Sequence, residues 1–125
     1  MKIEIPISCG ELVDKLSILE IKKTEIKNEE KLKQVLNEFN ALKEIYKKIF
    51  MNSKEIETFY KDLLIVNKEL WEIEDKLRKL EKEEKFDRIF IELARSVYIT
   101  NDRRFSIKKA INEMFGSEIQ EQKDY

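Results

Sequence analysis

The feature that most limits the fold of this chain is a long run, from Glu11 to Phe115, that contains no glycine and no proline. These two residue types are the ones that most often interrupt a helix. The two glycines, Gly10 and Gly116, and the only proline, Pro6, lie near the ends of the 125-residue chain. The sequence therefore predicts an all-α fold of long helices, in a single domain that spans residues 1–125.

The balance of charges in the chain argues against some classes of binding partner. Charged residues make up 41% of the chain, but 25 basic and 26 acidic residues leave a formal net charge of −1. There is therefore no long-range positive field to attract nucleic acid or an anionic membrane surface. The single cysteine, Cys9, cannot close an intramolecular disulfide, and no apolar run approaches the ~20 residues that span a bilayer. We expect a cytoplasmic protein with no nucleic-acid partner and no membrane segment.

The first residues predict a short extended segment, residues 1–8, because apolar and polar side chains alternate in it. The apolar ones are Ile3, Ile5 and Ile7. Such a segment either lies on the body of the protein or pairs with another chain. Ser8 then has the spacing of a capping box with Glu11, in which the two side chains satisfy free amide groups at the start of a helix. The first helix is therefore predicted to begin here.

The first helix has apolar residues on more than one side. Leu12, Leu16 and Leu19 share one arc of this helix. Three further apolar residues point elsewhere: Val13, Ile18 and Ile21. A helix of this kind is either central in the fold or part of an interface, and we expect the protein to be a homodimer.

Apolar residues that recur at spacings of three and four predict three further helices. Asn28 or Glu29 begins the second helix, and Asn52–Ser53 separates it from the third. Phe86 begins the fourth helix.

Gly116 is a suitable left-handed terminator for the fourth helix, and residues 117–125 form a polar tail after it. The heptad spacing of the apolar residues also fits a long two-stranded coiled coil. The connections between the helices are short, however, and short connections favour folding back on the same chain. We therefore predict an antiparallel helical bundle of four long helices with a short N-terminal extended segment.

A dense set of polar and aromatic side chains accompanies the apolar seams of the third and fourth helices. On the third helix these side chains lie beside the seam, towards a neighbouring helix. Glu74 and Arg78, one turn apart, are equally explained by an ordinary charge ladder along the helix surface. The complete set is Asn67, Trp71, Glu74, Arg78, Arg95, Tyr98, Asn101, Asp102, Arg104 and Lys108.

Two interpretations of the fourth helix give its polar residues different roles. If the helix is continuous, Asn101, Arg104 and Lys108 lie at the centre of its buried arc. Buried cations would then need a carboxylate partner such as Glu74, an anionic ligand or a water-filled cavity. If the helix breaks at residues 100–102, the polar residues there merely cap a new helix.

The acidic residues of the third helix also raise the question of a metal site. Glu69, Glu72 and Asp75 have the spacing of the acidic pairs that hold magnesium in some all-helical nucleotide pyrophosphohydrolases. Their heptad positions largely face away from the seam, whereas metal ligands must converge inward. The chain has no histidine for a zinc set and no glycine-rich loop for phosphates. We therefore expect no metal and no cofactor.

Three stretches carry a resemblance to a known family: Ser8 to Leu16, Asn67 to Arg78, and Phe90 to Arg104. Together with the ending at Gly116–Ser117 and the terminal Tyr125, they resemble an uncharacterised bacterial family of unknown function, number 6165. Members of that family tend to occur near surface-polysaccharide and glycosyltransferase genes. The resemblance implies a role in sugar or nucleotide-sugar metabolism, and it transfers no catalytic residue.

A weaker likeness is to the all-helical chorismate mutases. The first helix begins with Glu11 and Leu12 and continues through Asp14 towards a cationic residue, as theirs does. Lys22 or Lys23 would have to replace the arginine of those enzymes, and the later helices do not match.

The leading hypothesis is that the third and fourth helices form a polar pocket for a small anionic metabolite, such as a sugar phosphate or a nucleotide sugar. Glu74 and Asp102 would orient the cations of this pocket or act as acid and base. The ligand-binding residues would be Asn67, Trp71, Arg78, Arg95, Tyr98, Asn101, Arg104 and Lys108.

The main alternative is a noncatalytic, dimeric interaction module or a scaffold for a glycosyltransferase. Its partner-binding face would be apolar, with Val13, Ile18 and Ile21 as candidates. A further alternative is a helical mutase or pyrophosphohydrolase. No motif in the sequence names a reaction.

Overall fold

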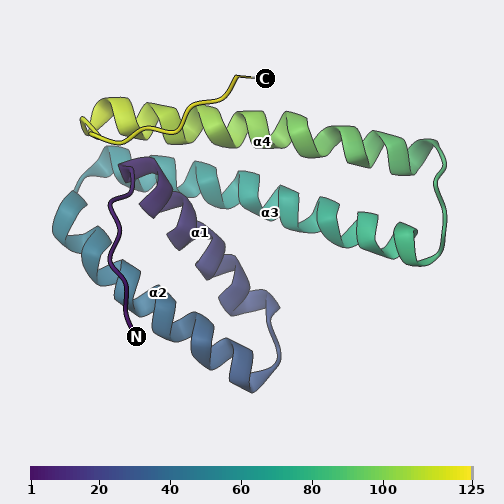
Figure 1. Ribbon diagram of the computed structural model, residues 1–125, viewed down its shortest axis with the longest axis horizontal. Coiled ribbons are helices and arrows are strands. Elements are labelled where there is room, and N and C mark those ends of the chain that lie inside the picture. The colour runs from purple at the N-terminus through teal and green to yellow at the C-terminus, as the bar shows by residue number, and fades with distance from the viewer. Residues whose placement is uncertain (125) are drawn as a thin grey trace.

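The computed structural model describes residues 1–124, in which the regular secondary structure is all α-helical and no strand occurs (Figure 1). The helices are α1 (Cys9–Glu25), α2 (Glu29–Phe50), α3 (Lys54–Lys82) and α4 (Arg88–Met114). α1 and α2 form one antiparallel hairpin, and α3 and α4 form another. The predicted class, an antiparallel bundle of four long helices, is confirmed. None of these helices has an apolar stretch long enough to cross a membrane.

Each helix begins where a polar side chain accepts a hydrogen bond from a free backbone N–H group. Ser8, Asn28, Ser53 and Asp87 are these N-terminal caps. The first three are the predicted breaks, while α4 begins slightly later than predicted. Gly116 has the left-handed φ of 61° expected of a helix terminator.

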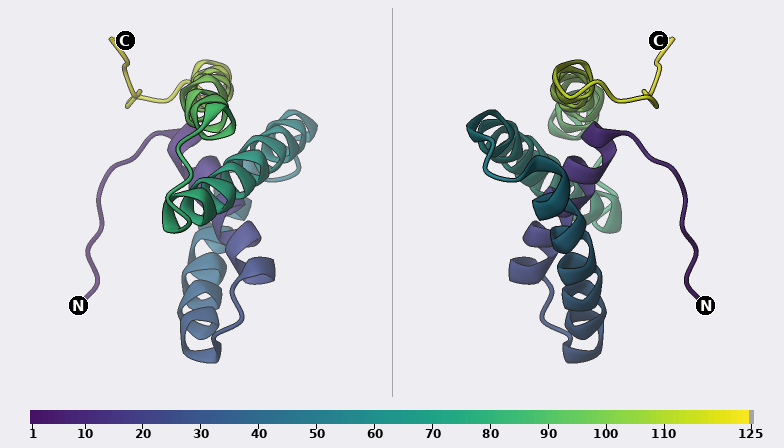
Figure 2. Two further views of the ribbon diagram at one scale, coloured as in Figure 1. Left: turned by 90° about the vertical axis from the view of Figure 1, so that its right-hand side faces the viewer. Right: turned by 90° about the vertical axis from the view of Figure 1, so that its left-hand side faces the viewer.

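The predicted extended segment and polar tail flank the helices. Residues 1–7 form no helix and are exposed (Figure 2), so this segment does not lie on the body of the protein. The predicted tail, residues 117–125, is described as far as Asp124, and Tyr125 lies outside the described residues. In Figure 1 the tail turns back along α4.

The two hairpins meet at one end and diverge from there (Figures 1 and 2). α1 packs against all three other helices, which settles its position as central. The hydrophobic core lies where the hairpins meet. Its buried residues are Leu12, Val13, Leu16, Leu19, Val35, Phe39, Tyr46, Phe50, Ile56, Leu63 and Ile111.

A close contact between backbones brings the start of α1 onto α4. A Cβ atom added at Gly10 would lie 2.5 Å from the backbone oxygen of Lys108, so only glycine fits without a shift. The Gly10 N–H group donates a 2.7 Å hydrogen bond to Oδ1 of Asn112. The N–H group of Cys9 donates a hydrogen bond to Oγ of Ser117, at 3.1 Å. These contacts fix the first turn of α1 beside the C-terminal part of α4.

α4 runs without a break from Arg88 to Met114. Thr100 is buried, and Asn101 accepts a hydrogen bond from Arg104 one turn ahead, at 3.3 Å. Asn101 therefore supports a side chain of the same helix instead of capping a new one. The continuous interpretation of the fourth helix is correct.

The far half of the α3–α4 hairpin extends beyond the other two helices (Figure 1). We call this part the distal arm: Leu70–Lys82 of α3, residues 83–87, and Arg88–Val97 of α4. No residue of the distal arm is fully buried. Its seam residues are half-buried instead, namely Leu70, Ile73, Leu77, Leu80, Phe90, Leu93 and Val97.

Candidate functional site

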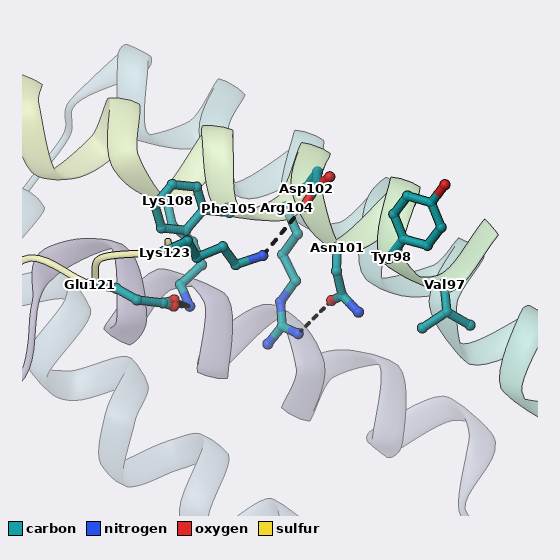
Figure 3. A pocket seen from close by; sticks show the side chains of 9 residues that line it. All are labelled: Val97, Tyr98, Asn101, Asp102, Arg104, Phe105, Lys108, Glu121 and Lys123. Carbon is teal, nitrogen blue, oxygen red and sulfur yellow. Dashed lines mark hydrogen bonds and ion pairs between the residues drawn. The ribbon is translucent and has the colours of Figure 1, made fainter. Parts of the chain in front are cut away.

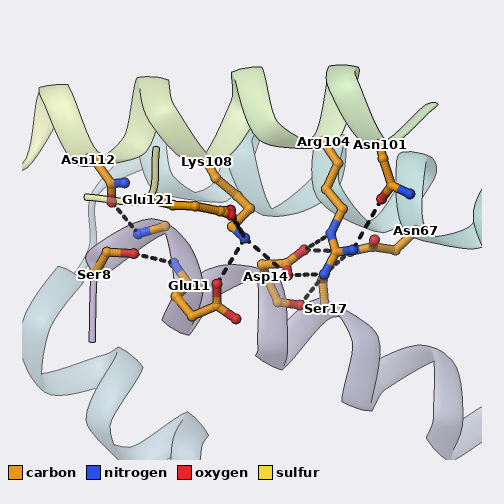
Figure 4. Close-up of polar contacts among 11 residues, drawn as sticks. Ser8, Glu11, Asp14, Ser17, Asn67, Asn101, Arg104, Lys108, Asn112 and Glu121 are labelled. Atoms are coloured by element: carbon orange, nitrogen blue, oxygen red, sulfur yellow. Dashed lines mark hydrogen bonds and ion pairs between the residues drawn. The ribbon is translucent and has the colours of Figure 1, made fainter. Parts of the chain in front are cut away.

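A buried ion pair joins α1 to α4 at the place where the hairpins meet (Figure 4). The Asp14 side chain is 0% exposed, and its carboxylate accepts two hydrogen bonds from the Arg104 guanidinium. Nε lies 2.9 Å from Oδ1, and Nη2 lies 2.5 Å from Oδ2. Such bidentate pairs are strong and directional. Because a lone buried carboxylate is very costly, Arg104 is the counter-ion that lets Asp14 be buried.

α3 completes the surroundings of Asp14. The Asn67 amide donates to Oδ1 of Asp14 at 2.9 Å and to Oγ of Ser17 at 2.8 Å. Ser17 in turn donates to the backbone oxygen of Asp14 at 2.7 Å. In residues 1–124, no buried side-chain nitrogen or oxygen is left without a partner. We call Asp14, Ser17, Asn67, Arg104 and Lys108 the buried network.

Lys108 is the second cation of the buried network, and it is only 7% exposed. Its ammonium lies 2.8 Å from Glu11, 3.3 Å from Glu121 and 4.0 Å from Asp14. Burial lowers the pKa of Lys108, but the hydrogen bond to Glu11 and the charges of these three carboxylates outweigh that effect, so its pKa is raised. The hydrogen bond to Asp14 raises the pKa of Arg104 despite burial. Both cations therefore stay charged.

A cavity of about 610 Å³ lies between α4 and the C-terminal tail (Figure 3). This volume is in the range that holds small molecules. On the tail side, Lys123 lies 3.6 Å from the Asp102 carboxylate and 5.1 Å from the centre of the Phe105 ring. We call this space the tail cavity. It is lined by Val97, Tyr98, Asn101, Asp102, Arg104, Phe105, Lys108, Glu121 and Lys123.

A second cavity, of about 380 Å³, lies between α1 and the beginning of the distal arm. We call it the groove cavity. Arg104 lines both cavities and is therefore part of the wall that they share. The residues around the groove cavity are Ile18, Ile21, Asn67, Leu70, Trp71, Glu74, Asp75, Arg78 and Arg104.

The predicted site residues are thus divided between two spaces, where the sequence predicted one pocket. Arg95 is exposed and lines neither cavity. Glu74 and Asp102, the candidate acid and base, line different cavities and so do not face one shared ligand. Tyr98, Asn101, Asp102, Arg104 and Lys108 line the tail cavity, whereas Asn67, Trp71, Glu74, Arg78 and again Arg104 line the groove cavity. Ligand binding by these residues stays a prediction.

The carboxylates that neutralise the buried cations were not identified from the sequence. A carboxylate partner was one of the three expected alternatives, and Glu74 was its example; among the described residues, however, Glu74 forms no ion pair with either cation. The partners are Asp14 and Glu11 on α1 and Glu121 in the tail. One signal was present, because α1 is apolar on several sides. Polar residues that lie between the apolar sides of such a helix, here Asp14 and Ser17, are buried with them and need partners.

The predicted apolar partner-binding face is also wrong. Val13 and Ile21 are buried in the core region, and Ile18 is half-buried against the groove cavity. α1 uses its extra apolar sides to contact three helices instead of a second molecule. The large exposed apolar side chains lie elsewhere, several of them on the distal arm: Phe86, Ile89 and Ile91.

The acidic residues of α3 do not converge. Glu69 forms a 2.8 Å ion pair with Arg103 of α4 instead of joining Glu72 and Asp75. Within residues 1–124, no group of three or more Asp, Glu, Cys or His side chains is placed to hold a metal ion.

Comparison with known proteins gives one match. The model of the Family of unknown function (DUF6165) matches residues 1–125. No curated protein and no solved structure matches the chain. The match assigns neither an activity nor a ligand, so the function has to follow from the chemistry of the two cavities and of the exposed surface.

Proposed function

This chain belongs to the DUF6165 family of unknown function, and we propose that it binds a small anionic metabolite in the tail cavity. One observation carries the proposal. Lys108, a nearly buried cation on the cavity wall, is held from the tail by Glu121, at 3.3 Å and 3.4 Å. An anion in the cavity can replace that carboxylate without disturbing the helices.

The three carboxylates near Lys108 are not equivalent. Glu11 and Asp14 belong to α1, which packs against the other three helices, and the Asp14 side chain is 0% exposed. Glu121 lies beyond the last helix, and its side chain is 40% exposed. A phosphate oxygen that takes its position keeps the charge on Lys108 balanced and gains a charge-assisted hydrogen bond. The tail carboxylate is therefore the group that we expect a ligand to displace.

The other cavity walls suit a ligand that carries hydroxyl groups. The Tyr98 hydroxyl and the Asn101 amide offer directed hydrogen bonds, and the Phe105 ring offers an apolar surface. A sugar phosphate or a nucleotide sugar carries hydroxyl groups for these hydrogen bonds as well as a phosphate. The gene neighbourhood of the resembling bacterial family is the reason to link this ligand class to surface-polysaccharide biosynthesis in the cytoplasm.

Isothermal titration calorimetry with a panel of sugar phosphates and nucleotide sugars tests this proposal. Glu121→Gln removes the competing charge, so we expect tighter binding. Glu118→Gln, on the same tail but outside the cavity lining, is the matched control. Tyr98→Phe should weaken binding by roughly 2- to 10-fold, which is the loss of one hydrogen bond.

Two results would overturn the proposal. One is that no compound of the panel binds the wild-type protein. The other is that Glu121→Gln and Tyr98→Phe both bind with the wild-type affinity. Lys108 is left unchanged in this test because its loss would also disturb the buried network.

A second candidate function is a noncatalytic interaction module or a scaffold for a glycosyltransferase. It is favoured by a different observation: Arg104 and Lys108 already have carboxylate partners, while Phe86, Ile89 and Ile91 of the distal arm are exposed. A scaffold would bind no compound of the panel and would retain its protein partner in the Glu121→Gln and Tyr98→Phe variants. Co-purification of these variants with a glycosyltransferase encoded nearby distinguishes the two functions.

A further inference from the structure

The groove of the α3–α4 hairpin is only partly filled by α1. α1 crosses the hairpin obliquely: near its start, Asp14 pairs with Arg104 of α4, and at its end Glu25 pairs with Lys68 of α3. Beyond this crossing, no other described segment covers the distal arm (Figure 1). The same groove therefore continues along the distal arm, open on the side that α1 covers elsewhere.

The floor of the open groove is apolar. Leu70 and Trp71 of α3 line the groove cavity, and farther along the arm the seam residues Leu77 of α3 and Phe90 of α4 are only half-buried. At the end of the arm, the exposed ring of Phe86 packs against Phe90, with ring centres 5.2 Å apart. Two helices with an apolar seam and no covering layer are half of a four-helix bundle.

The rim of the open groove carries opposite charges that do not pair with each other. Trp71, Glu74 and Arg78 line the groove cavity together, so their side chains lie on the same face of α3. Within residues 1–124, neither Glu74 nor Arg78 forms an ion pair or a side-chain hydrogen bond. The charge ladder that was the alternative explanation of their spacing therefore does not form between Glu74 and Arg78. Arg88 and Glu92, at the same spacing on α4, do pair, at 3.1 Å.

We propose that a second copy of this chain docks on the open groove, with its distal arm antiparallel to the first, about a two-fold axis midway between Glu74 and Arg78. In a two-fold interface, residue i contacts residue j and j contacts i. Glu74 of each copy then faces Arg78 of the other. The two unpaired charges of one rim become two ion pairs between the copies.

The antiparallel direction follows from the position of α1. In a parallel arrangement, the two α1 helices would compete for the same space, because each copy fills its own groove next to the arm. In the antiparallel arrangement, each α1 lies beyond the end of the other arm. The four arm helices then form an antiparallel bundle with the apolar seams inside it.

The alignment of α3 with α4 shows which part of α4 lies nearest the proposed two-fold axis. The Glu69–Arg103 ion pair fixes which residues of α3 and α4 are level with each other. Counting equally from that pair along both helices brings the point midway between Glu74 and Arg78 level with Ser96. Ala94, level with Arg78 by the same count, is exposed and small, so two α4 helices can approach closely beside the axis. This dimer does not depend on ligand binding in the tail cavity.

Sedimentation equilibrium over a wide range of protein concentrations tests the proposal. We expect a dimer for the wild-type protein. Glu74→Arg and Arg78→Glu each place like charges opposite one another, and should raise the dimer dissociation constant by about tenfold or more. The double variant restores opposite charges in exchanged positions, and should dimerise within a few-fold of the wild type.

The matched controls are Glu72→Arg and Lys76→Glu, exposed positions of the same helix that do not line the groove cavity. Both should dimerise like the wild type, and circular dichroism should show that every variant keeps its helix content. A wild-type protein that stays monomeric overturns the proposal. So does a double variant that dimerises no better than the two single variants, because the copies would then meet through another face.

Discussion

α3 and α4 run through both the place where the hairpins meet and the distal arm, yet their seam residues are more deeply buried in the first region than in the second. Leu63 and Leu77 both belong to the apolar seam of α3, but Leu63 is 0% exposed and Leu77 is only half-buried. The difference comes from α1, which covers the hairpin at Leu63 and has left it before Leu77. A heptad pattern predicts which side of a helix faces a neighbour, and not whether a third helix covers that contact.

The cations of the two regions show the same difference. Arg104 lies under α1, where Asp14 is fully buried against it. Arg78 lies past the crossing and stays exposed, without an ion pair among the described residues. The same residue type is thus an internal counter-ion in one region and is available to a partner in the other. Four tests address this comparison, from the largest expected effect to the smallest.

Removing the charge of Asp14 should have the largest effect. Asp14→Asn keeps the size of the side chain but leaves Arg104 in the buried network without its carboxylate. Breaking one side of a buried ion pair costs about 3–5 kcal/mol of the free energy of unfolding. Urea denaturation followed by circular dichroism measures it. Asp62→Asn, at an exposed position of α3, is the control, and an equal loss in both variants would contradict the role of Asp14 in the buried network.

Two leucines of one helix compare the regions directly. Leu63→Ala should lose about 2–5 kcal/mol of the free energy of unfolding, because it leaves a cavity in a closed core. Leu77→Ala should lose about 1 kcal/mol, because this side chain already has part of its surface in water. Both are measured at low protein concentration, where any dimer dissociates. Equal losses would show that the distal arm is as closely packed as the core.

Gly10→Ala tests the close contact that holds α1 on α4. The added Cβ atom would meet the backbone oxygen of Lys108 at 2.5 Å, and backbone atoms cannot turn aside as a flexible side chain can. We expect a loss of about 1–3 kcal/mol, since the helices must move apart. Lys15→Ala, at an exposed site of α1, should change the free energy of unfolding by less than about 0.5 kcal/mol. Thermal unfolding measures both variants. If Gly10→Ala and Lys15→Ala lose the same stability, the close contact at Gly10 is contradicted.

The helices were predictable from the sequence because their signals are local. Ser8, Asn28 and Ser53 cap helices within a few residues of themselves, and the left-handed conformation of Gly116 follows from its lack of a side chain. The burial of Lys108 was also predictable, because it follows from the periodicity of a continuous α4.

The partners of the polar residues were not predictable because they come from distant parts of the chain. Asp14 meets Arg104 only because α1 crosses the second hairpin, and Glu121 meets Lys108 only because the tail turns back. No local pattern encodes the angle between two hairpins. The sequence therefore grouped Arg78 with Lys108 in one pocket, although these two residues line different cavities.

Alkaline pH should produce the smallest effect, and it should arise where the hairpins meet. Burial raises the pKa of Tyr60, and so do the charge of Glu20 and the hydrogen bond that the tyrosine hydroxyl donates to it at 3.0 Å. Below the ordinary value of 10.0, Tyr60 keeps its proton in the folded and the unfolded state, and its contribution is fully present. Above that value only the unfolded chain loses the proton, so the free energy of unfolding falls as pH rises.

Urea denaturation at intervals from pH 8 to beyond pH 10 measures this contribution. The raised pKa values of Tyr46 and Lys108 act in the same direction, so the wild-type protein should lose stability throughout the alkaline range. Tyr60→Phe has no proton to lose at this position, and its stability should fall less steeply with pH. Tyr98→Phe, an exposed tyrosine of α4, should follow the wild-type curve. If Tyr60→Phe also follows that curve, the contact between α3 and α1 at Glu20 does not favour the protonated tyrosine, and this hydrogen bond does not help to hold the two hairpins together.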